Sequence, residues 1–262
     1  MIIAAGGIYS ALRSKYWPNH SVKFKGAVAY RTVFPISRLQ GIEGFHDDSS
    51  AWRGDGEVVF LSELGLGQYG VVIIRRETSE YAATLQWEHS VGADGLQRLR
   101  ECYKGWDPVI TKVLNIIDDI EAYPLDSGPW LEALSRDDRI AFVGDAAHPT
   151  AGAFGAGAAM GFGDCWALTR ALEASRESSG AVDGNYNVPR ALRIFQAARL
   201  PFLTRVEKQM ELDTKSAIYV AEASKNEEEW VRRFKERNPL SQWLTEHDVE
   251  LEVQKATMEE PL

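Results

Sequence analysis

The most informative stretch of the sequence is Arg139-Ile140-Ala141-Phe142-Val143-Gly144-Asp145-Ala146-Ala147-His148-Pro149. It is followed by a series of glycines, namely Gly152, Gly155, Gly157, Gly161 and Gly163. A short apolar run, an acidic residue at its end and a glycine-rich segment predict a buried strand that leads through a turn into a helix. In α/β folds, ligands bind beyond the carboxyl ends of strands. This stretch is therefore a candidate ligand site.

Three features of the turn suit a cofactor. Asp145 can accept hydrogen bonds from sugar-type hydroxyls. The glycines let the backbone approach a flat or phosphorylated ligand without an intervening Cβ. A helix that begins near Gly157 offers free N–H groups and the positive end of its dipole to negative charge. The residues alone thus indicate a cofactor-binding site, and the alternative is a tight glycine–alanine crossover that serves only helix–sheet packing.

The composition narrows the class of protein. The chain has 262 residues, with 29 Lys and Arg against 38 Asp and Glu, which gives a net charge of −9. This acidic balance argues against a nucleic-acid partner, and no apolar run is long enough to predict a membrane-spanning helix. The two cysteines, Cys102 and Cys165, are too few for a disulfide framework or a cysteine-rich zinc site, so no metal site is predicted. Because the start carries no signal-peptide pattern, we expect a cytoplasmic protein.

The predicted elements indicate an α/β protein of the α+β kind. Near the start we expect a short buried strand at 2–5 and a helix at 8–16. The alternating pattern that follows predicts a mainly antiparallel sheet with one solvent-exposed face, with strands at 22–33, 57–61, 71–76 and 81–89. Next we expect helices at 93–103 and 109–117 and strands at 120–125 and 139–143. Asp107-Pro108 supplies the cap and first residue of the second helix.

The last part of the chain is predicted to form a helical tail. An amphipathic pattern predicts a long helix at 191–223 that is broken at Pro201, and a second helix at 227–237. The last dozen residues look frayed.

The turn motif also resembles a known family. Gly144-Asp145-Ala146-Ala147-His148-Pro149 is similar to the second flavin motif of the aromatic-hydroxylase flavoprotein monooxygenases, the salicylate-hydroxylase-like family of single-component enzymes. The match continues from Gly155 to Asp164 and into the helix at 166–172. A motif of this length is specific, and together with two weaker matches it spans most of the chain.

The resemblance implies roles for four residues of this stretch. In the family, the aspartate at the position of Asp145 bonds the ribityl chain of FAD. The loop and helix N-terminus that correspond to Gly155, Gly157 and Ala158 face the pyrophosphate and the edge of the isoalloxazine ring. The resemblance thus implies that these four residues bind FAD.

Two further matches concern arginines. The segment from Ile2 to Arg13 resembles the family's middle motif, although Gly6 stands where the motif has aspartate. This implies that Arg13 contacts the flavin or nicotinamide phosphates, and the alternative is a solvated helix end. Ala29-Tyr30-Arg31 resembles a strand that faces the substrate in phenol hydroxylases. The guanidinium of Arg31 could hold a phenolate there and act in catalysis, and the alternative is an exposed strand arginine.

The activity that the resemblance implies is that of an FAD-dependent monooxygenase, closest to the fungal branch that works on natural products. NAD(P)H would reduce FAD, O₂ would add to form a flavin C4a-hydroperoxide, and one oxygen atom would pass to an aromatic, phenolic or polyketide-type small molecule. The expected regions are a remnant of the FAD-binding domain at 1–17, a substrate domain at 18–138, an FAD-binding segment at 139–188 and a helical tail at 189–262.

The sequence also departs from the family. The family opens with a strand–Gly-x-Gly-x-x-Gly–helix unit that holds the FAD pyrophosphate, and we find no such unit. The chain is expected to begin where the family is already more than a third complete. The family's usual proline in the flavin loop is Gly152 here, and its usual glutamate before Asp164 is Gly163. Two alternatives therefore stay open: a truncated, non-catalytic remnant, or a protein that binds a hydrophobic metabolite and cannot hold FAD alone. A homodimer or a partner could then cover the incomplete sheet.

Several side chains have two interpretations. His148 could be a catalytic base or an ordinary histidine satisfied by turn carbonyls. Tyr69 could orient a substrate hydroxyl. Most tryptophans are expected in the core or in a pocket wall, namely Trp52, Trp87, Trp106, Trp130 and Trp166.

Overall fold

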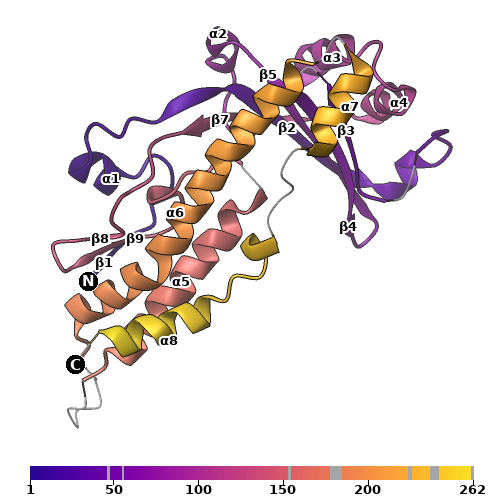
Figure 1. The fold of residues 1–262 in the computed structure, drawn as a ribbon. Coiled ribbons are helices and arrows are strands. Elements are labelled where there is room, and N and C mark those ends of the chain that lie inside the picture. The colour runs from indigo at the N-terminus through magenta and orange to yellow at the C-terminus, as the bar shows by residue number, and fades with distance from the viewer. Residues whose placement is uncertain are drawn as a thin grey trace. The chain divides into compact units, whose positions relative to one another are not determined.

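The computed structural model describes residues 1–45, 48–54, 56–152, 155–177, 185–223, 226–236 and 242–260. Figure 1 shows the elements in chain order. They fall into two compact units. Unit 1 comprises Met1–Lys23, Asp126–Ala223 and Glu228–Leu262, and unit 2 comprises Phe24–Leu125 with Ser224–Glu227.

Unit 1 contains a small sheet with the order β1-β9-β8, formed by Ile2–Ala4, Ile140–Phe142 and Ser135–Arg136. Strand β1 pairs in parallel with β9, and β8 pairs with β9 in antiparallel. The strands predicted at 2–5 and 139–143 are confirmed. The burial predicted for the first of them is wrong, because Ile2 and Ile3 are each 52% exposed. The cause is that β1 lies at the edge of this sheet, where β9 is its one partner strand among the described residues.

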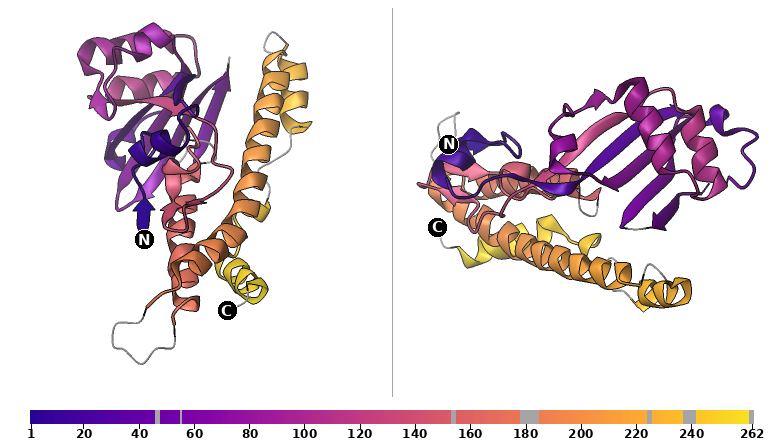
Figure 2. Two further views of the ribbon diagram at one scale, coloured as in Figure 1. Left: turned by 90° about the vertical axis from the view of Figure 1, so that its left-hand side faces the viewer. Right: turned by 90° about the horizontal axis from the view of Figure 1, so that it is seen from above.

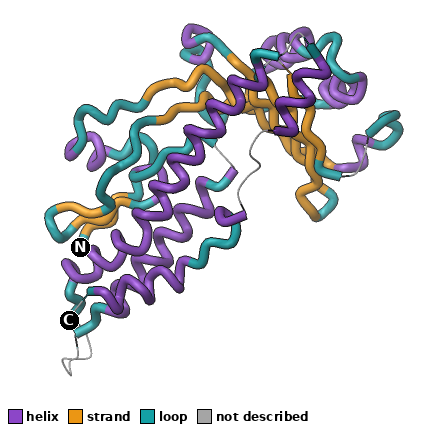
Figure 3. The backbone as a smooth tube through the Cα atoms, viewed as in Figure 1, coloured by secondary structure: helices purple, strands orange, loops and turns teal. Residues whose placement is uncertain are grey.

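Helices make up most of unit 1: α1 (Ala11–Tyr16), α5 (Gly157–Ala174), α6 (Val188–Ala221), α7 (Glu227–Glu236) and α8 (Val249–Glu259). Helices α5, α6 and α8 pack against one another and lie side by side, purple in Figure 3. The core of the unit joins these helices to β9, whose three residues are all buried. The helix that opens at Gly157 is therefore confirmed.

Two predictions for the helical tail are wrong. Helix α6 is not broken at Pro201 but continues through it, because buried residues on both sides, such as Ala198 and Leu203, hold the helix on the core despite the hydrogen bond that proline removes. The described residues near the end, up to 260, are not frayed either, and residues 261 and 262 lie outside the described ranges. Asp248 caps α8 by accepting a hydrogen bond from the N–H of Leu251, and Val253 and Ala256 enter the core.

Unit 2 is built on a six-stranded sheet with the order β3-β4-β5-β2-β7-β6. Its strands are β2 (Lys23–Pro35), β3 (Ser50–Gly54), β4 (Glu57–Gly65), β5 (Gln68–Arg76), β6 (His89–Ser90) and β7 (Glu121–Ser127). The pairs β2–β5, β3–β4, β4–β5 and β6–β7 are antiparallel, which confirms the mainly antiparallel sheet.

One predicted strand of unit 2 is wrong and one strand was not predicted. In place of a strand at 81–89, the chain forms the short helix α2 (Ser79–Ala82) and then only the two residues of β6. Thr78 explains the helix, because its side chain caps the N-terminus by accepting a hydrogen bond from the N–H of Tyr81. The unpredicted strand, β3, pairs with β4.

Helices α3 (Gly92–Cys102) and α4 (Pro108–Ile116) cover one face of this sheet (Figure 2), and their apolar residues share a core with β2, β4 and β5. Both helices match the prediction, and Asp107 caps α4 as expected. Residues that alternate with the core positions point to the other face of the sheet. On that face Val33 and Phe60 are 57% and 41% exposed, which confirms the solvent-exposed face.

The spacing Gly65-x-Gly67-x-x-Gly70 occurs in unit 2 but is not a nucleotide-binding unit. It forms the tight connection between β4 and β5, where Gly65 and Gly67 have positive φ angles of 82° and 71°. A strand follows it rather than a helix, so it presents no helix N-terminus to a phosphate.

A pair of substitutions in α8 tests whether the C-terminal helix belongs to the core. Val253 is 3% exposed, whereas Leu251 on the same helix is 46% exposed. Val253→Ala should lower the free energy of unfolding by about 1–2 kcal/mol through the lost methyl groups and the cavity left behind. Leu251→Ala should change it by less than about 0.5 kcal/mol. Chemical denaturation measures both, and equal effects would contradict the packing of α8.

Candidate functional site

The predicted turn lies where β9 ends and runs through a short 3₁₀ helix at Gly144–Ala146 toward α5. Gly144 has a positive φ of 59°, a conformation that favours glycine. An ideal Cβ built on Gly161 would lie 3.6 Å from the Cα of Gly144. The turn therefore approaches the first turns of α5 backbone to backbone.

Asp145 stands at the exposed side of this turn. One of its carboxylate oxygens, Oδ1, lies 4.0 Å from the position of an ideal Cβ on Gly157, so the carboxylate sits close to the start of α5. The surrounding protein raises the pKa of Asp145 by desolvation, against a smaller lowering effect of His148. A ligand that donates hydroxyl hydrogen bonds to this carboxylate would stabilise its ionised form.

Among the described residues, no side chain caps the N-terminus of α5. The cap residue is Ala156, whose side chain cannot accept the hydrogen bonds of the first-turn N–H groups, and no acidic residue lies in that turn. Gly155, Ala158 and Ala159 are exposed. Gly155 has a positive φ of 63° and nothing within 4 Å of an ideal Cβ. Free N–H groups at the end of an 18-residue helix favour a negatively charged or carbonyl oxygen.

Arg13 lies in the interior of unit 1, at 1% exposure. Its guanidinium donates hydrogen bonds to the carbonyl oxygens of Asp145, at 3.4 Å, and of Pro129. Burial lowers its pKa. The alternative of a solvated helix end is therefore wrong, and Arg13 supports the turn from the side of α1.

His148 and Asp164 form a buried pair behind the turn, at 1% and 0% exposure. The distance from His148 Nε2 to Asp164 Oδ2 is 2.6 Å. Since an ionised carboxylate only accepts, Nε2 carries the proton of this hydrogen bond. The partner of His148 is thus a carboxylate, not the turn carbonyls that the sequence led us to expect.

Arg199 completes this buried group from α6. Its Nε donates to Asp164 Oδ1 at 2.9 Å and its Nη2 to the carbonyl of Met160 at 3.2 Å. The N–H of Gly144 donates to Asp164 Oδ2 at 2.8 Å. Burial alone would raise the pKa of Asp164, but the hydrogen bond and charge of His148, the charge of Arg199 and the Gly144 N–H together hold that pKa below its usual range.

Sequence reasoning missed Asp164 and Arg199 as members of the site. A signal was present: Asp164 continues the buried face of α5 that includes Met160, Ala167 and Leu168. A charged residue on an apolar helix face needs a partner of opposite charge. The same geometry accounts for Gly163, because an ideal Cβ there would lie only 3.2 Å from Arg199 Nη2.

Two of the remaining candidates, Arg31 and Tyr69, lie in unit 2. Arg31 is exposed on the uncovered face of the sheet, opposite Val72 of β5, and its guanidinium carbon lies 5.0 Å from the centre of the Tyr123 ring. Tyr69 lies on the covered face at 0% exposure, beside the rings of Phe34 and Phe45. Of the predicted tryptophans, Trp87 and Trp166 do not lie in the core, since each is 55% exposed.

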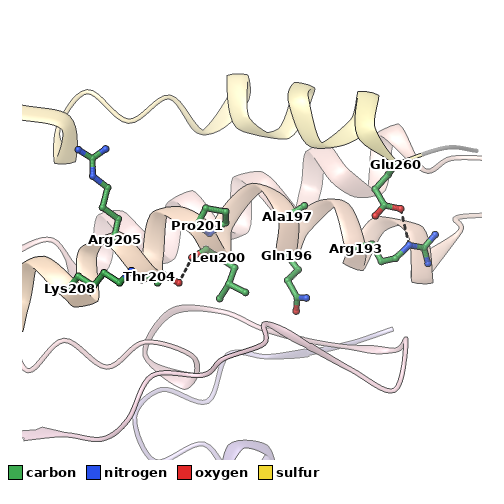
Figure 4. Close-up of a pocket in the computed structure, with 9 residues that line it drawn as sticks. All are labelled: Arg193, Gln196, Ala197, Leu200, Pro201, Thr204, Arg205, Lys208 and Glu260. Carbon is green, nitrogen blue, oxygen red and sulfur yellow. Dashed lines mark hydrogen bonds and ion pairs between the residues drawn. The ribbon is translucent and has the colours of Figure 1, made fainter.

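Unit 1 also has an open groove of about 640 Å³ along α6 (Figure 4). Two of its cations already have partners: Arg193 pairs with Glu260 at 2.9 Å, and Arg205 lies 3.9 Å from the centre of the Trp243 ring. These contacts join α6 to the segments before and after α8, so we attribute the groove to helix packing.

Within the described ranges, no group of three or more His, Cys, Asp or Glu side chains is placed to hold a metal ion. Among the same residues, no helix is both long enough and apolar enough to cross a membrane.

Comparison with known proteins shows what the chain is similar to. The fold matches that of a solved structure of CtdE in complex with FAD and a substrate, with a TM-score of 0.77 over 98% of this chain and 63% of that chain; at 15% sequence identity, this shows the fold alone. The chain thus shares its fold with the matching part of CtdE.

The chain is also similar to two curated relatives. The chain is 26% identical over 208 residues to 6-hydroxynicotinate 3-monooxygenase of Bordetella bronchiseptica, covering 79% of this chain and 51% of the relative. It is 26% identical over 283 residues to salicylate hydroxylase of Pseudomonas putida, covering 98% of this chain and 60% of the relative. The resemblance to FAD-dependent monooxygenases of the aromatic-hydroxylase type is confirmed.

Two facts delimit this resemblance. No family model matches the chain. The chain also spans about half the length of the 6-hydroxynicotinate 3-monooxygenases that it matches.

The contact between Arg199 and His247 predicts a pH dependence of stability. Arg199 Nη1 lies 3.2 Å from His247 Nε2, which must be the unprotonated acceptor because a guanidinium only donates. Burial, and then the charge of Arg199, lower the pKa of His247. The unfolded chain therefore takes up a proton below about pH 6.5 that the folded chain resists, so the free energy of unfolding should fall as the pH drops from 7 through that range.

The variant His247→Gln removes the titrating group and keeps an oxygen that can accept from Arg199. Its loss of stability between pH 7 and pH 5.5, measured by urea unfolding, should be smaller than that of the original chain. An identical loss in both proteins would show that His247 does not cause it.

Proposed function

We propose that this chain forms the flavin-contacting and substrate-binding parts of an FAD-dependent monooxygenase. The enzyme would insert one oxygen atom from O₂ into an aromatic, phenolic or polyketide-type small molecule and would use NAD(P)H as reductant. The observation that carries the proposal is the exposed carboxylate of Asp145 beside the uncapped N-terminus of α5.

The residues of the turn fit one part of FAD. A carboxylate that accepts hydroxyl hydrogen bonds suits the ribityl chain, so we assign Asp145 to it. The N–H groups at Gly157 and Ala158 suit the pyrophosphate or a carbonyl oxygen of the isoalloxazine ring. The exposed backbone at Gly155, with its positive φ, lets such a group approach closely. Arg13 supports this geometry through the carbonyl of Asp145.

Bound FAD would supply the redox chemistry, and the protein would supply orientation and electrostatics. Asp145 would fix the position of the flavin along its ribityl chain. The positive end of the α5 dipole would stabilise negative charge on the part of the cofactor that it faces. This division of roles needs no metal ion.

The uncovered sheet face of unit 2 suits an aromatic substrate that carries a negative charge. It presents apolar side chains, such as Val33, Phe60 and Val72, around the guanidinium of Arg31. Arginine binds phenolates and carboxylates and also stacks on aromatic rings, as Arg31 does on Tyr123. The names of the two relatives, a 6-hydroxynicotinate monooxygenase and a salicylate hydroxylase, refer to aromatic acids. We therefore propose Arg31 as the substrate-side cation.

The edge of β1 favours a second candidate. Ile2 and Ile3 are half-exposed on a strand that, within the described ranges, pairs with β9 alone. An open apolar strand edge tends to pair with another strand. In this second candidate function, the chain by itself binds a hydrophobic molecule or is a non-catalytic remnant. It holds FAD only when another strand-bearing unit or a second copy covers β1.

An FAD titration tests the first candidate. The purified chain should bind FAD in a one-to-one, saturable manner, followed by quenching of flavin fluorescence. Asp145→Ala should weaken binding by roughly 10- to 100-fold, because hydrogen bonds to a charged group contribute about 1.5–3 kcal/mol. The control Asp94→Ala, at an exposed position in α3 of unit 2, should bind like the original chain.

Absence of FAD binding by a folded chain would favour the second candidate. Equal affinities of the original chain and Asp145→Ala would remove Asp145 from the flavin site, whatever the affinity itself.

Arg31 is tested with an aromatic acid as the probe. Salicylate should bind to the chain, and Arg31→Met should weaken that binding by about tenfold, equivalent to about 1.4 kcal/mol for the lost charged contact. Lys112→Met removes a positive charge from α4 on the covered side of the same unit and serves as the control. Calorimetry measures all three affinities, and a loss of the same size in the control would assign the effect to net charge rather than to Arg31.

A further inference from the structure

Asp164 connects the turn to the helices of unit 1. On one side, its Oδ2 accepts hydrogen bonds from the N–H of Gly144 and from His148, which lie on either side of Asp145. On the other side, its Oδ1 accepts from Arg199 of α6. The two ends of the segment 144–148 are thus tied to one carboxylate.

The connection extends to the N-terminal turns of α5. Arg199 donates a second hydrogen bond to the carbonyl of Met160, four residues before Asp164. Gly161 lies between them and approaches Gly144 so closely that an ideal Cβ on Gly161 would be 3.6 Å from the Cα of Gly144. The turn and the start of α5 are therefore held at one fixed separation.

This separation matters because two groups from different structural elements must bind the same ligand. The carboxylate of Asp145 comes from the turn, and the free N–H groups come from α5. Asp145 itself is exposed, and its carboxylate oxygen lies 4.0 Å from an ideal Cβ on Gly157. A ligand that uses both can bind tightly only if they are already in place.

We propose that Asp164 is a positioning residue: through His148 and Gly144 it holds Asp145 at a fixed place relative to the N-terminus of α5. Its ionised carboxylate accepts from the turn on one oxygen and from Arg199 on the other. The identity of the ligand as FAD rests on the proposed function, whereas the ordering of the turn does not.

A purely structural role of Asp164 predicts a different pattern of effects. A residue that only stabilises the core affects the whole of unit 1 when it is altered. A positioning residue affects the turn first, so that amide exchange rises at 144–150 while the distant end of α5, at 168–174, keeps its protection.

The experiment compares three variants: two substitutions of the buried His148 and one of the exposed Glu173. His148→Phe keeps a ring of similar size but donates no hydrogen bond to Asp164, whereas His148→Gln keeps a side-chain N–H donor. Glu173→Gln, at the exposed end of α5, is the control. Hydrogen–deuterium exchange of the turn and FAD titration are measured on each folded variant.

We expect His148→Phe to speed exchange at 144–150 by about tenfold and to weaken FAD binding by a similar factor, with protection at 168–174 unchanged. His148→Gln should recover most of both, and Glu173→Gln should match the original chain. If His148→Phe leaves the turn and the FAD affinity unchanged, or if exchange rises throughout α5, the proposal is overturned.

Two further outcomes are also decisive. If His148→Phe does not fold, Asp164→Asn takes its place and is measured with the same readouts. Glu173→Gln is then its matched control, because both substitutions change a carboxylate to an amide. If the original chain binds no FAD, the proposed function fails, and exchange at 144–150 still decides whether Asp164 orders the turn.

Discussion

A carboxylate without access to water shapes unit 1. Asp164 is fully buried, and a charge in such a place is stable only when hydrogen-bond donors surround it. Its donors come from the turn after β9, from His148 and from α6. Because all of these donors bond to one side chain of α5, the turn, α5 and α6 have little freedom to move independently. The exposed candidate site at Asp145 depends on this buried arrangement.

The parts of the fold that were predicted correctly carry strong local signals. The strand, turn and helix from Ile140 to Ala174 follow from an apolar run, glycines and helical spacing, and α4 follows from the Asp107 cap. The predicted strand at 81–89 failed because Thr78 caps a helix turn that outweighs the strand-forming residues after it. Helix α8 was missed because its stability comes from packing on α5 and α6, which no local pattern reveals.

The residues of the candidate site likewise fall into those that could be predicted from the sequence and those that could not. Asp145, Gly155 and Gly157 could be selected from the sequence because backbone freedom and a carboxylate after a strand carry chemical meaning on their own. The contribution of Arg199 could not, since its partner is 35 residues away in the chain and their contact exists only after α5 and α6 have packed. Arg13 was selected, but its interior position was not foreseen, because helix α1 is short and looks solvent-exposed from its polar residues.

The burial of the Asp164–Arg199 pair also determines how the protein responds to salt. Mobile counter-ions screen charges on a protein surface over roughly 10 Å at about 0.1 M ionic strength, but they reach buried pairs far less. The exposed pairs of α7, such as Arg232–Glu229, therefore weaken as salt is added. By the same argument the pair behind the turn weakens far less, so the geometry around Asp145 should depend little on the salt concentration.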